Sequence, residues 1–195
     1  IPDLEIQKSI KTFQAPIGRQ EIVYKGKFVV MVDFAHTPNS FTSILPDIKT
    51  SISGRLIHVF GSAGKRDETK RPLMGEAASR FDDIIILTSE DSRTESVSEI
   101  NKQISAGISN FKFLISNEFQ NDKYKKGDKV LLEIPDRKKA IEYAISIAKK
   151  GDFILFTGKG HEKSMNMGNG EEPWDEVAVV KEALKKNKVY KVESL

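Results

Sequence analysis

The sequence predicts an α/β protein with a doubly wound, mostly parallel sheet. Two observations predict it. Apolar runs of strand length alternate with amphipathic segments of helix length, which is typical of parallel strands joined by right-handed helical crossovers. Polar, glycine-containing loops follow several of the apolar runs, as expected where strands end at one edge of such a sheet. No internal repeat indicates a different architecture.

The chain is expected to begin its fold with a β-hairpin. Residues 21–24 and 28–34 are strand-like and are joined by Lys-Gly-Lys, a short turn signal. Residues 1–17 show no strand partner for this hairpin. They are therefore interpreted as the tail of a preceding domain with a linker, and residues 18–195 as one domain.

Capping and breaking residues mark the ends of the later elements. Thr37 and Pro38 fit a helix N-cap and first helical position, Pro46 disturbs that helix, and Asp136 and Gly151 cap and end another. The expected strands are 55–60, 84–88, 130–134 and 153–157. The expected helices are 37–52, 70–81, 97–108, 136–150 and 175–187. Residues 84–88 are expected inside the sheet, 111–129 as an insertion or surface strand, and 165–173 as a loop.

Composition excludes several classes of function. The 195 residues are 38% hydrophobic, enough for one core, and 31 Lys and Arg against 28 Asp and Glu give a net charge of only +3. The basic residues are scattered except at 185–188, near a helix C-terminus, so no nucleic-acid partner is expected. The absence of cysteine excludes disulfides and thiolate metal sites. No apolar run has membrane-spanning length, so a cytoplasmic protein without a membrane partner is expected.

The segment FTGKGHEKS at 156–164 is the strongest candidate for a site. It leaves an apolar run, and Gly158 and Gly160 let the backbone turn sharply and approach a ligand. Ligands of open α/β sheets bind outside the carboxyl ends of the strands. A polar turn without a ligand is the alternative, and two other polar loops in equivalent positions favour a site.

Two familiar nucleotide-binding motifs are absent. The loop at 61–67 has two residues between its glycines where a P-loop has four, and Arg66 follows Lys65 where a P-loop has Ser or Thr. The dinucleotide fingerprint G-x-G-x-x-G is missing after the first strand, which argues against an oxidoreductase.

Four strand-exit segments resemble, in order, the motifs of one family. They are DFAHTPNS at 33–40, FGSAGKRDETKRPLM at 60–74, TSEDSRTE at 88–95 and GKGHE at 158–162. Together they resemble the C-terminal domain of the Mur ligases, the ATP-dependent amide-bond-forming enzymes of peptidoglycan synthesis. They are similar above all to the branch that adds the third stem-peptide residue to UDP-N-acetylmuramoyl-dipeptide.

The resemblance implies a Rossmann-like fold and a reaction in which ATP phosphorylates the nucleotide-peptide carboxylate and an incoming amine displaces phosphate. In the family, the P-loop and the Mg²⁺ ligands lie in a central domain, of which residues 1–17 would be the tail. The substrates would be UDP-N-acetylmuramoyl-dipeptide and a free amino acid, with ATP and Mg²⁺ as cofactors. This chain alone, with no catalytic residue or metal ligand, is expected to be an inactive monomer.

The resemblance also implies roles for individual residues. Near ATP it places Asp33, His36, Asn39, Lys65 and Asp67. Around the amino-acid substrate it places Arg66, Glu90, Asp91, Arg93, Gly158 and Glu162.

Elementary chemistry agrees with the amino-acid roles. Arg93 can hold a carboxylate with two parallel hydrogen bonds, while Glu90, Asp91 or Glu162 can accept from an ammonium group. A second zwitterionic centre, as in meso-diaminopimelate, would use both kinds of group.

Simpler readings of the same residues stay open. Arg93 could form a surface ion pair with Glu90 or Glu95, Asp33 could satisfy only loop amides, and His36 could be structural.

The segment at 90–93 is Glu-Asp-Ser-Arg where the diaminopimelate-using family has Asp-Asn-Pro-Arg, Lys65 replaces a usual Asp, and 173–176 lacks an arginine common in the family. The His-Glu ending of 158–162 is typical of ligases for diaminopimelate rather than lysine.

Two alternatives are a non-catalytic nucleotide-binding or regulatory module derived from such a ligase, and a ligase of the folylpolyglutamate synthase type. The latter shares D-x-A-H-x-P but is not expected to carry GKGHE.

Overall fold

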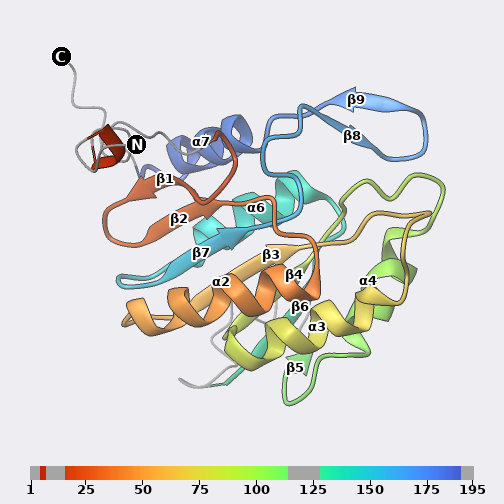
Figure 1. Ribbon diagram of the computed structural model, residues 1–195, viewed down its shortest axis with the longest axis horizontal. Coiled ribbons are helices and arrows are strands. Elements are labelled where there is room, and N and C mark those ends of the chain that lie inside the picture. The colour runs from red at the N-terminus through yellow and green to blue at the C-terminus, as the bar shows by residue number, and fades with distance from the viewer. Residues whose placement is uncertain (1–4, 8–15, 114–127, 190–195) are drawn as a thin grey trace.

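The computed structural model describes residues 5–7, 16–113 and 128–189. Figure 1 shows a twisted sheet with helices on both sides. The interpretation of residues 1–17 as a tail and linker falls mostly outside the described residues, as does most of the 111–129 stretch. No helix in the described ranges is long and apolar enough to cross a membrane.

The main sheet has seven strands in the order β1-β2-β7-β3-β4-β6-β5. The strands are β1 (Glu21–Lys25), β2 (Val29–Val32), β3 (Leu56–Phe60), β4 (Ile84–Leu87), β5 (Lys112–Phe113), β6 (Val130–Glu133) and β7 (Phe153–Phe156). Strands β1 and β2 form the predicted antiparallel hairpin, and every other neighbouring pair is parallel. The prediction of a doubly wound, mostly parallel sheet is confirmed. Strand β4 is flanked on both sides, as expected.

Helices cover both faces of the sheet (Figure 1). They are α2 (Pro38–Ser51), α3 (Lys70–Phe81), α4 (Val97–Ser105), α6 (Arg137–Ser146) and α7 (Glu176–Lys186). Helices α2, α3 and α4 pack in a row on one face, and α6 and α7 pack together on the other. Both faces of the sheet are therefore covered, which explains why the inner strands β4 and β7 are continuously apolar.

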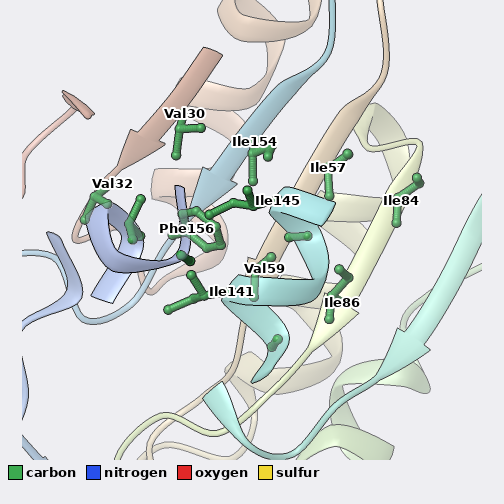
Figure 2. Packing of buried hydrophobic residues seen from close by; sticks show 14 of the residues in the cluster. Val30, Val32, Ile57, Val59, Ile84, Ile86, Ile141, Ile145, Ile154 and Phe156 are labelled. Atoms are coloured by element: carbon green, nitrogen blue, oxygen red, sulfur yellow. The ribbon is translucent and has the colours of Figure 1, made fainter. Parts of the chain in front are cut away.

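Alternation of side chains along each strand divides the core in two. In β3, Ile57 and Val59 face α6 and α7, while Leu56 and Phe60 face α2, α3 and α4. Figure 2 shows the first of these cores, in which Ile141 of α6 lies against the strand residues. Hydrophobic packing on both faces holds the strands in place. The loops that leave the strands therefore start from defined positions.

The predicted caps form as the sequence indicates. Thr37 and Ser40 make a reciprocal capping box at α2, with Pro38 in the first turn, and Pro46 lies inside the helix. The Asp136 and Asp175 side chains each accept a hydrogen bond from a backbone N–H in the first turn of α6 and α7.

Two predicted helix ends and one predicted loop are wrong. Helix α4 ends at Ser105 rather than at 108. Helix α6 ends at Ser146 rather than at 150, because the Asp152 carboxylate accepts from Lys149 N and the chain then turns through Gly151 at φ +89°. The expected loop at 165–173 contains the antiparallel strands β8 (Ser164–Asn166) and β9 (Glu171–Pro173). These strands are short, polar and largely exposed, so they carry no hydrophobic alternation.

Gly75 lets α3 approach α4, because a Cβ at this position would lie 2.1 Å from the Ile104 carbonyl oxygen. We expect Gly75→Ala to destabilise the protein by about 1 to 3 kcal/mol through overpacking, although alanine is the better helix former. Urea denaturation measures the change, with Ser98→Ala at an exposed site of α4 as the control. Equal stability of Gly75→Ala and the parent would contradict this contact.

Candidate functional site

Four loops meet at the carboxyl edge of the sheet, where β2, β3, β4 and β7 end, and they line a pocket of about 360 Å³. All the residues predicted to contact the amino acid line it, namely Arg66, Glu90, Asp91, Arg93, Gly158 and Glu162. Of those predicted to contact ATP, His36 and Asp67 line the pocket, while Asp33, Asn39 and Lys65 do not. Motifs far apart in the sequence thus share one pocket.

Glu90 is a buried acid of the pocket. The residue is 6% exposed, and its Oε2 atom has no hydrogen-bond partner in the described part of the chain. It packs against Gly158, where a Cβ would lie 2.3 Å from that oxygen. Burial raises the pKa of the Glu90 carboxyl, and the charges of Arg137, Lys70 and Lys159 oppose the shift. A ligand ammonium group would satisfy this carboxylate.

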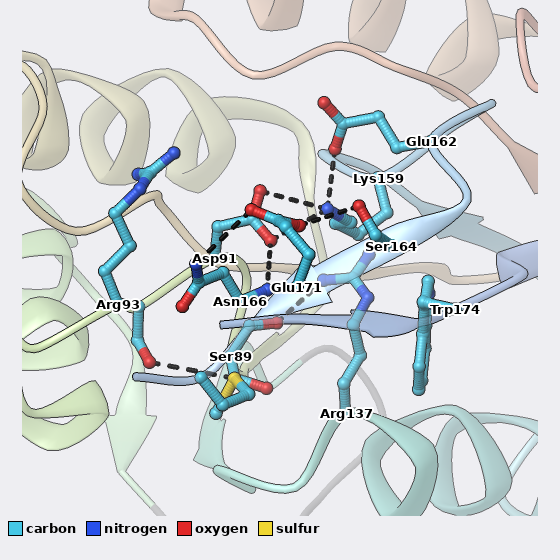
Figure 3. Close-up of polar contacts among 12 residues, drawn as sticks. Ser89, Asp91, Arg93, Arg137, Lys159, Glu162, Ser164, Asn166, Glu171 and Trp174 are labelled. Atoms are coloured by element: carbon cyan, nitrogen blue, oxygen red, sulfur yellow. Dashed lines mark hydrogen bonds and ion pairs between the residues drawn. The ribbon is translucent and has the colours of Figure 1, made fainter. Parts of the chain in front are cut away.

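Lys159 is the second residue of the GKGHE turn. Its ammonium forms ion pairs with two other acids of the pocket (Figure 3). Its ammonium lies 2.9 and 3.0 Å from the Asp91 carboxylate oxygens and 2.6 Å from Glu162. Its side chain is 1% exposed. Asp91 also accepts from Asn166 N at 2.9 Å. The sequence reasoning assigned Lys159 no role, because a lysine between two glycines is usually a solvent-exposed turn residue.

Arg93 takes neither of the ion pairs considered from the sequence. Its Nη1 donates to the Gly64 carbonyl at 2.6 Å. Glu95 instead pairs with Arg71, whose side chain is fully buried. Backbone φ at Arg93 is +52°, and its N–H donates to Asn166 O at 2.9 Å. Arg93 is therefore held by the Gly64 carbonyl, and Glu95 does not neutralise its positive charge.

A buried ion pair lies beneath these loops. Arg137 contacts Glu176 with nitrogen–oxygen distances of 2.6, 3.0 and 3.1 Å, and neither side chain is exposed. The same guanidinium donates to Ser89 O at 3.1 Å and Thr157 O at 2.7 Å, just after β4 and β7. Trp174 donates to the Glu176 carboxylate. Arg137 was missed because a cation after a helix cap is usually exposed.

The predicted ATP residues are more dispersed. Both Asp33 oxygens accept from loop amides, Ala35 N at 2.6 Å and Gln20 N at 2.8 Å, as in the structural alternative. His36 Nδ1 lies 2.9 Å from Phe34 O, and its carbonyl accepts from Lys70, a pocket residue that the sequence reasoning missed.

Asn39, Lys65 and Asp67 are exposed. Hydrogen bonds from the side chain and backbone of Thr69 lower the pKa of the Asp67 carboxyl, so this group stays anionic at the rim of the pocket.

The residues present do not fit a magnesium site. Over residues 5–7, 16–113 and 128–189, no cluster of three or more His, Asp and Glu could hold a metal ion. No chemical step is therefore assigned to a metal in this chain.

The fold and the position of the pocket match the general pattern of open α/β sheets, in which ligands bind outside the carboxyl ends of the strands. A family model described as Mur ligase, glutamate ligase domain, matches residues 18–160. The chain belongs to this family. The resemblance read from the four motifs is confirmed.

Curated relatives agree with the family. The chain is 42% identical over 183 residues to the UDP-N-acetylmuramoyl-L-alanyl-D-glutamate–2,6-diaminopimelate ligase of Aquifex aeolicus, covering 94% of this chain and 34% of that protein. It is 44% identical over 168 residues to the UDP-N-acetylmuramyl-tripeptide synthetase of Borreliella burgdorferi, covering 86% and 30%. The chain thus spans about a third of the length of the curated relatives it matches.

Solved structures give the same picture. A structure of a UDP-N-acetylmuramoyl-L-alanyl-D-glutamate–2,6-diaminopimelate ligase matches with a TM-score of 0.73 and 31% identity, covering 90% of this chain and 33% of that one. A bifunctional folylpolyglutamate synthase/dihydrofolate synthase from Yersinia pestis, complexed with AMPPNP and Mn ion, matches with a TM-score of 0.59. Its 15% identity over 81% of this chain and 32% of that one shows a common fold only.

Replacing Glu90 tests whether its buried charge destabilises the folded protein. The folded-state pKa is raised above the ordinary value of 4.5, so Glu90 stabilises the fold below that pH and this contribution is lost as pH rises through the folded pKa. At pH 7 we expect the free energy of unfolding of Glu90→Gln to exceed that of the parent by about 1 to 3 kcal/mol. The difference should vanish near pH 4.5. Urea denaturation across this range measures it, and exposed Glu172→Gln is the control. A difference independent of pH would contradict the prediction.

Arg137 is expected to be essential for stability. Arg137→Met leaves Glu176 buried without its cation, which should cost about 3 to 5 kcal/mol. The double variant with Glu176→Gln should recover part of that loss. Lys138→Met is the matched control, because the neighbouring Lys138–Glu182 pair is exposed and should change stability by less than about 1 kcal/mol. Equal losses for Arg137→Met and Lys138→Met in denaturant titrations would refute the role of the buried pair.

Proposed function

We propose that this chain is the C-terminal, ATP- and amino-acid-contacting domain of an ATP-dependent amide ligase. In this proposal the ligase adds meso-diaminopimelate, as the third residue, to UDP-N-acetylmuramoyl-dipeptide. The observation that carries it is a pocket lined both by the Arg93 guanidinium and by Glu90, a buried acid whose Oε2 has no hydrogen-bond partner among the described residues. An amino acid brings the complementary ammonium and carboxylate.

The pocket residues would bind and orient the amino acid. Glu90 would accept hydrogen bonds from an ammonium group, and Glu162 offers a second carboxylate at the pocket. Arg93 would hold a carboxylate with the guanidinium nitrogens not directed at Gly64. Arg66 adds a positive charge at the exposed rim. The free amine, once deprotonated, attacks the carbonyl carbon of the acyl phosphate and phosphate leaves as the amide bond forms, and holding the amine in place lowers the entropic part of the barrier.

ATP would supply the chemistry that activates the acceptor carboxylate as a mixed anhydride with phosphate. The residues proposed to contact it are Asp33, His36, Asn39, Lys65 and Asp67. The loop from β2 is well ordered by the Asp33 hydrogen bonds, which supports a positioning role. Mg²⁺ is assigned to the central domain of the complete ligase. Residues 1–17 are proposed to be the end of that domain and a linker, with 18–195 as the C-terminal domain, and the monomeric state and cytoplasmic location stay predictions.

The alternatives have less support. The names of the relatives at 42% and 44% identity describe ligases, which argues against a non-catalytic module. The folylpolyglutamate synthase structure shares the fold at 15% identity only.

Arg93 provides the test of substrate class. With a distal carboxylate to hold, Arg93→Ala in the full-length ligase should lose about 2 to 5 kcal/mol of transition-state stabilisation with diaminopimelate, and far less with lysine. Lysine ends in a lone ammonium, which the guanidinium repels. Phosphate release with each amino acid, at fixed ATP, gives kcat/KM for both proteins.

The control for this assay is Arg80→Ala, because Arg80 is exposed on α3, lies outside the pocket and pairs with Glu76 of the same helix. A parent enzyme that prefers lysine, or equal losses with both amino acids, would show that the assignment of diaminopimelate is wrong.

A further inference from the structure

Lys159 is a buried cation shared by two acids from different parts of the chain. Its ammonium contacts both oxygens of Asp91, on the loop after β4, and Glu162, one turn further along its own loop. The exposed fractions are 1% for the Lys159 side chain, 15% for Asp91 and 38% for Glu162. Figure 3 shows these three groups meeting beside Asn166, whose N–H also bonds Asp91.

The arrangement controls how much negative charge the pocket presents. A buried ammonium requires paired acids, and removing one partner of such a cluster leaves the others uncompensated. Both Asp91 oxygens are turned toward Lys159, so this carboxylate is neutralised internally. Glu162 is the more exposed of the two acids and keeps access to the pocket.

We propose that Lys159 is a positioning residue that sets the charge selectivity of the pocket by neutralising Asp91 and orienting Glu162. The inference rests on the function proposed above. With Lys159 present, a ligand carboxylate can approach Arg93 without meeting the full charge of two acids. Without it, Asp91 and Glu162 would repel a distal carboxylate and attract a distal ammonium group.

The first experiment compares diaminopimelate with lysine as substrates of the full-length ligase. Lys159→Met should lower the ratio of kcat/KM for diaminopimelate over lysine by about ten- to a hundredfold, as expected for one uncompensated charge close to the ligand. The KM for ATP should change less than about twofold, because the ion pairs of Lys159 within the described residues are with Asp91 and Glu162, both proposed to contact the amino acid.

Two further variants separate charge from general damage. Adding Asp91→Asn to Lys159→Met removes the uncompensated charge of Asp91. The double variant should therefore regain most of the kcat/KM ratio of diaminopimelate over lysine. Asp91→Asn alone keeps Lys159 and should raise the ratio, which decides the matter even where Lys159→Met does not fold. Lys163→Met is the matched control, because this exposed lysine of the same segment pairs with Asp175 and does not line the pocket.

The outcomes distinguish this inference from the proposed function. A wild-type ligase that uses diaminopimelate, with a ratio unchanged in Lys159→Met and in Asp91→Asn, overturns the role of Lys159 and leaves the proposed function intact. A wild type that ligates neither amino acid overturns the proposed function. In that case, calorimetric titration of both amino acids into the same variants decides the Lys159 inference. A shift in the ratio of the Kd values for diaminopimelate and lysine supports it. An unchanged ratio, or no binding to wild type, overturns it.

Discussion

The buried ion pair between Arg137 and Glu176 is the interaction on which the geometry of the pocket depends. It joins the first turns of α6 and α7, and its guanidinium also binds the carbonyls of Ser89 and Thr157. Those carbonyls lie where the chain leaves β4 and β7 and enters the two loops that carry Glu90 and Lys159. A fully buried pair of this kind adds little net stability but costs much when one partner is lost. Its contribution is therefore geometric, because it holds two loops in one relative position.

The acids of the pocket above that pair differ in how their negative charge is compensated. Asp91 is neutralised by Lys159, Glu162 is shared between Lys159 and solvent, and Glu90 is buried with an oxygen that has no partner among the described residues. An isolated buried carboxylate is unfavourable, and proteins keep such groups mainly at functional sites, where a ligand compensates them. Because the rigid sheet beneath supplies ample hydrophobic burial, the fold can tolerate this local cost.

Family membership and substrate choice rest on different parts of the molecule. The chain matches a 2,6-diaminopimelate ligase and a tripeptide synthetase at similar identities of 42% and 44%. Overall similarity therefore does not select the amino acid. A few charges at the carboxyl edge can do so, since one uncompensated charge next to a ligand outweighs many conservative changes in the core.

Features that depend on local chain preferences can be predicted from the sequence. Strand β4, helix α3 and the Thr37 cap lie where the apolar pattern and the capping residues predicted them, and the strand-exit motifs identified the pocket edge. The pairing of Lys159 with Asp91 and of Arg137 with Glu176, which lie 68 and 39 residues apart along the chain, follows only from the tertiary structure. The tertiary structure also decided the short β8–β9 hairpin, which has no apolar alternation to reveal it. Periodicity and capping report on neighbours within a turn or a strand, whereas the pairing of buried charges follows from which loops the packed sheet brings together.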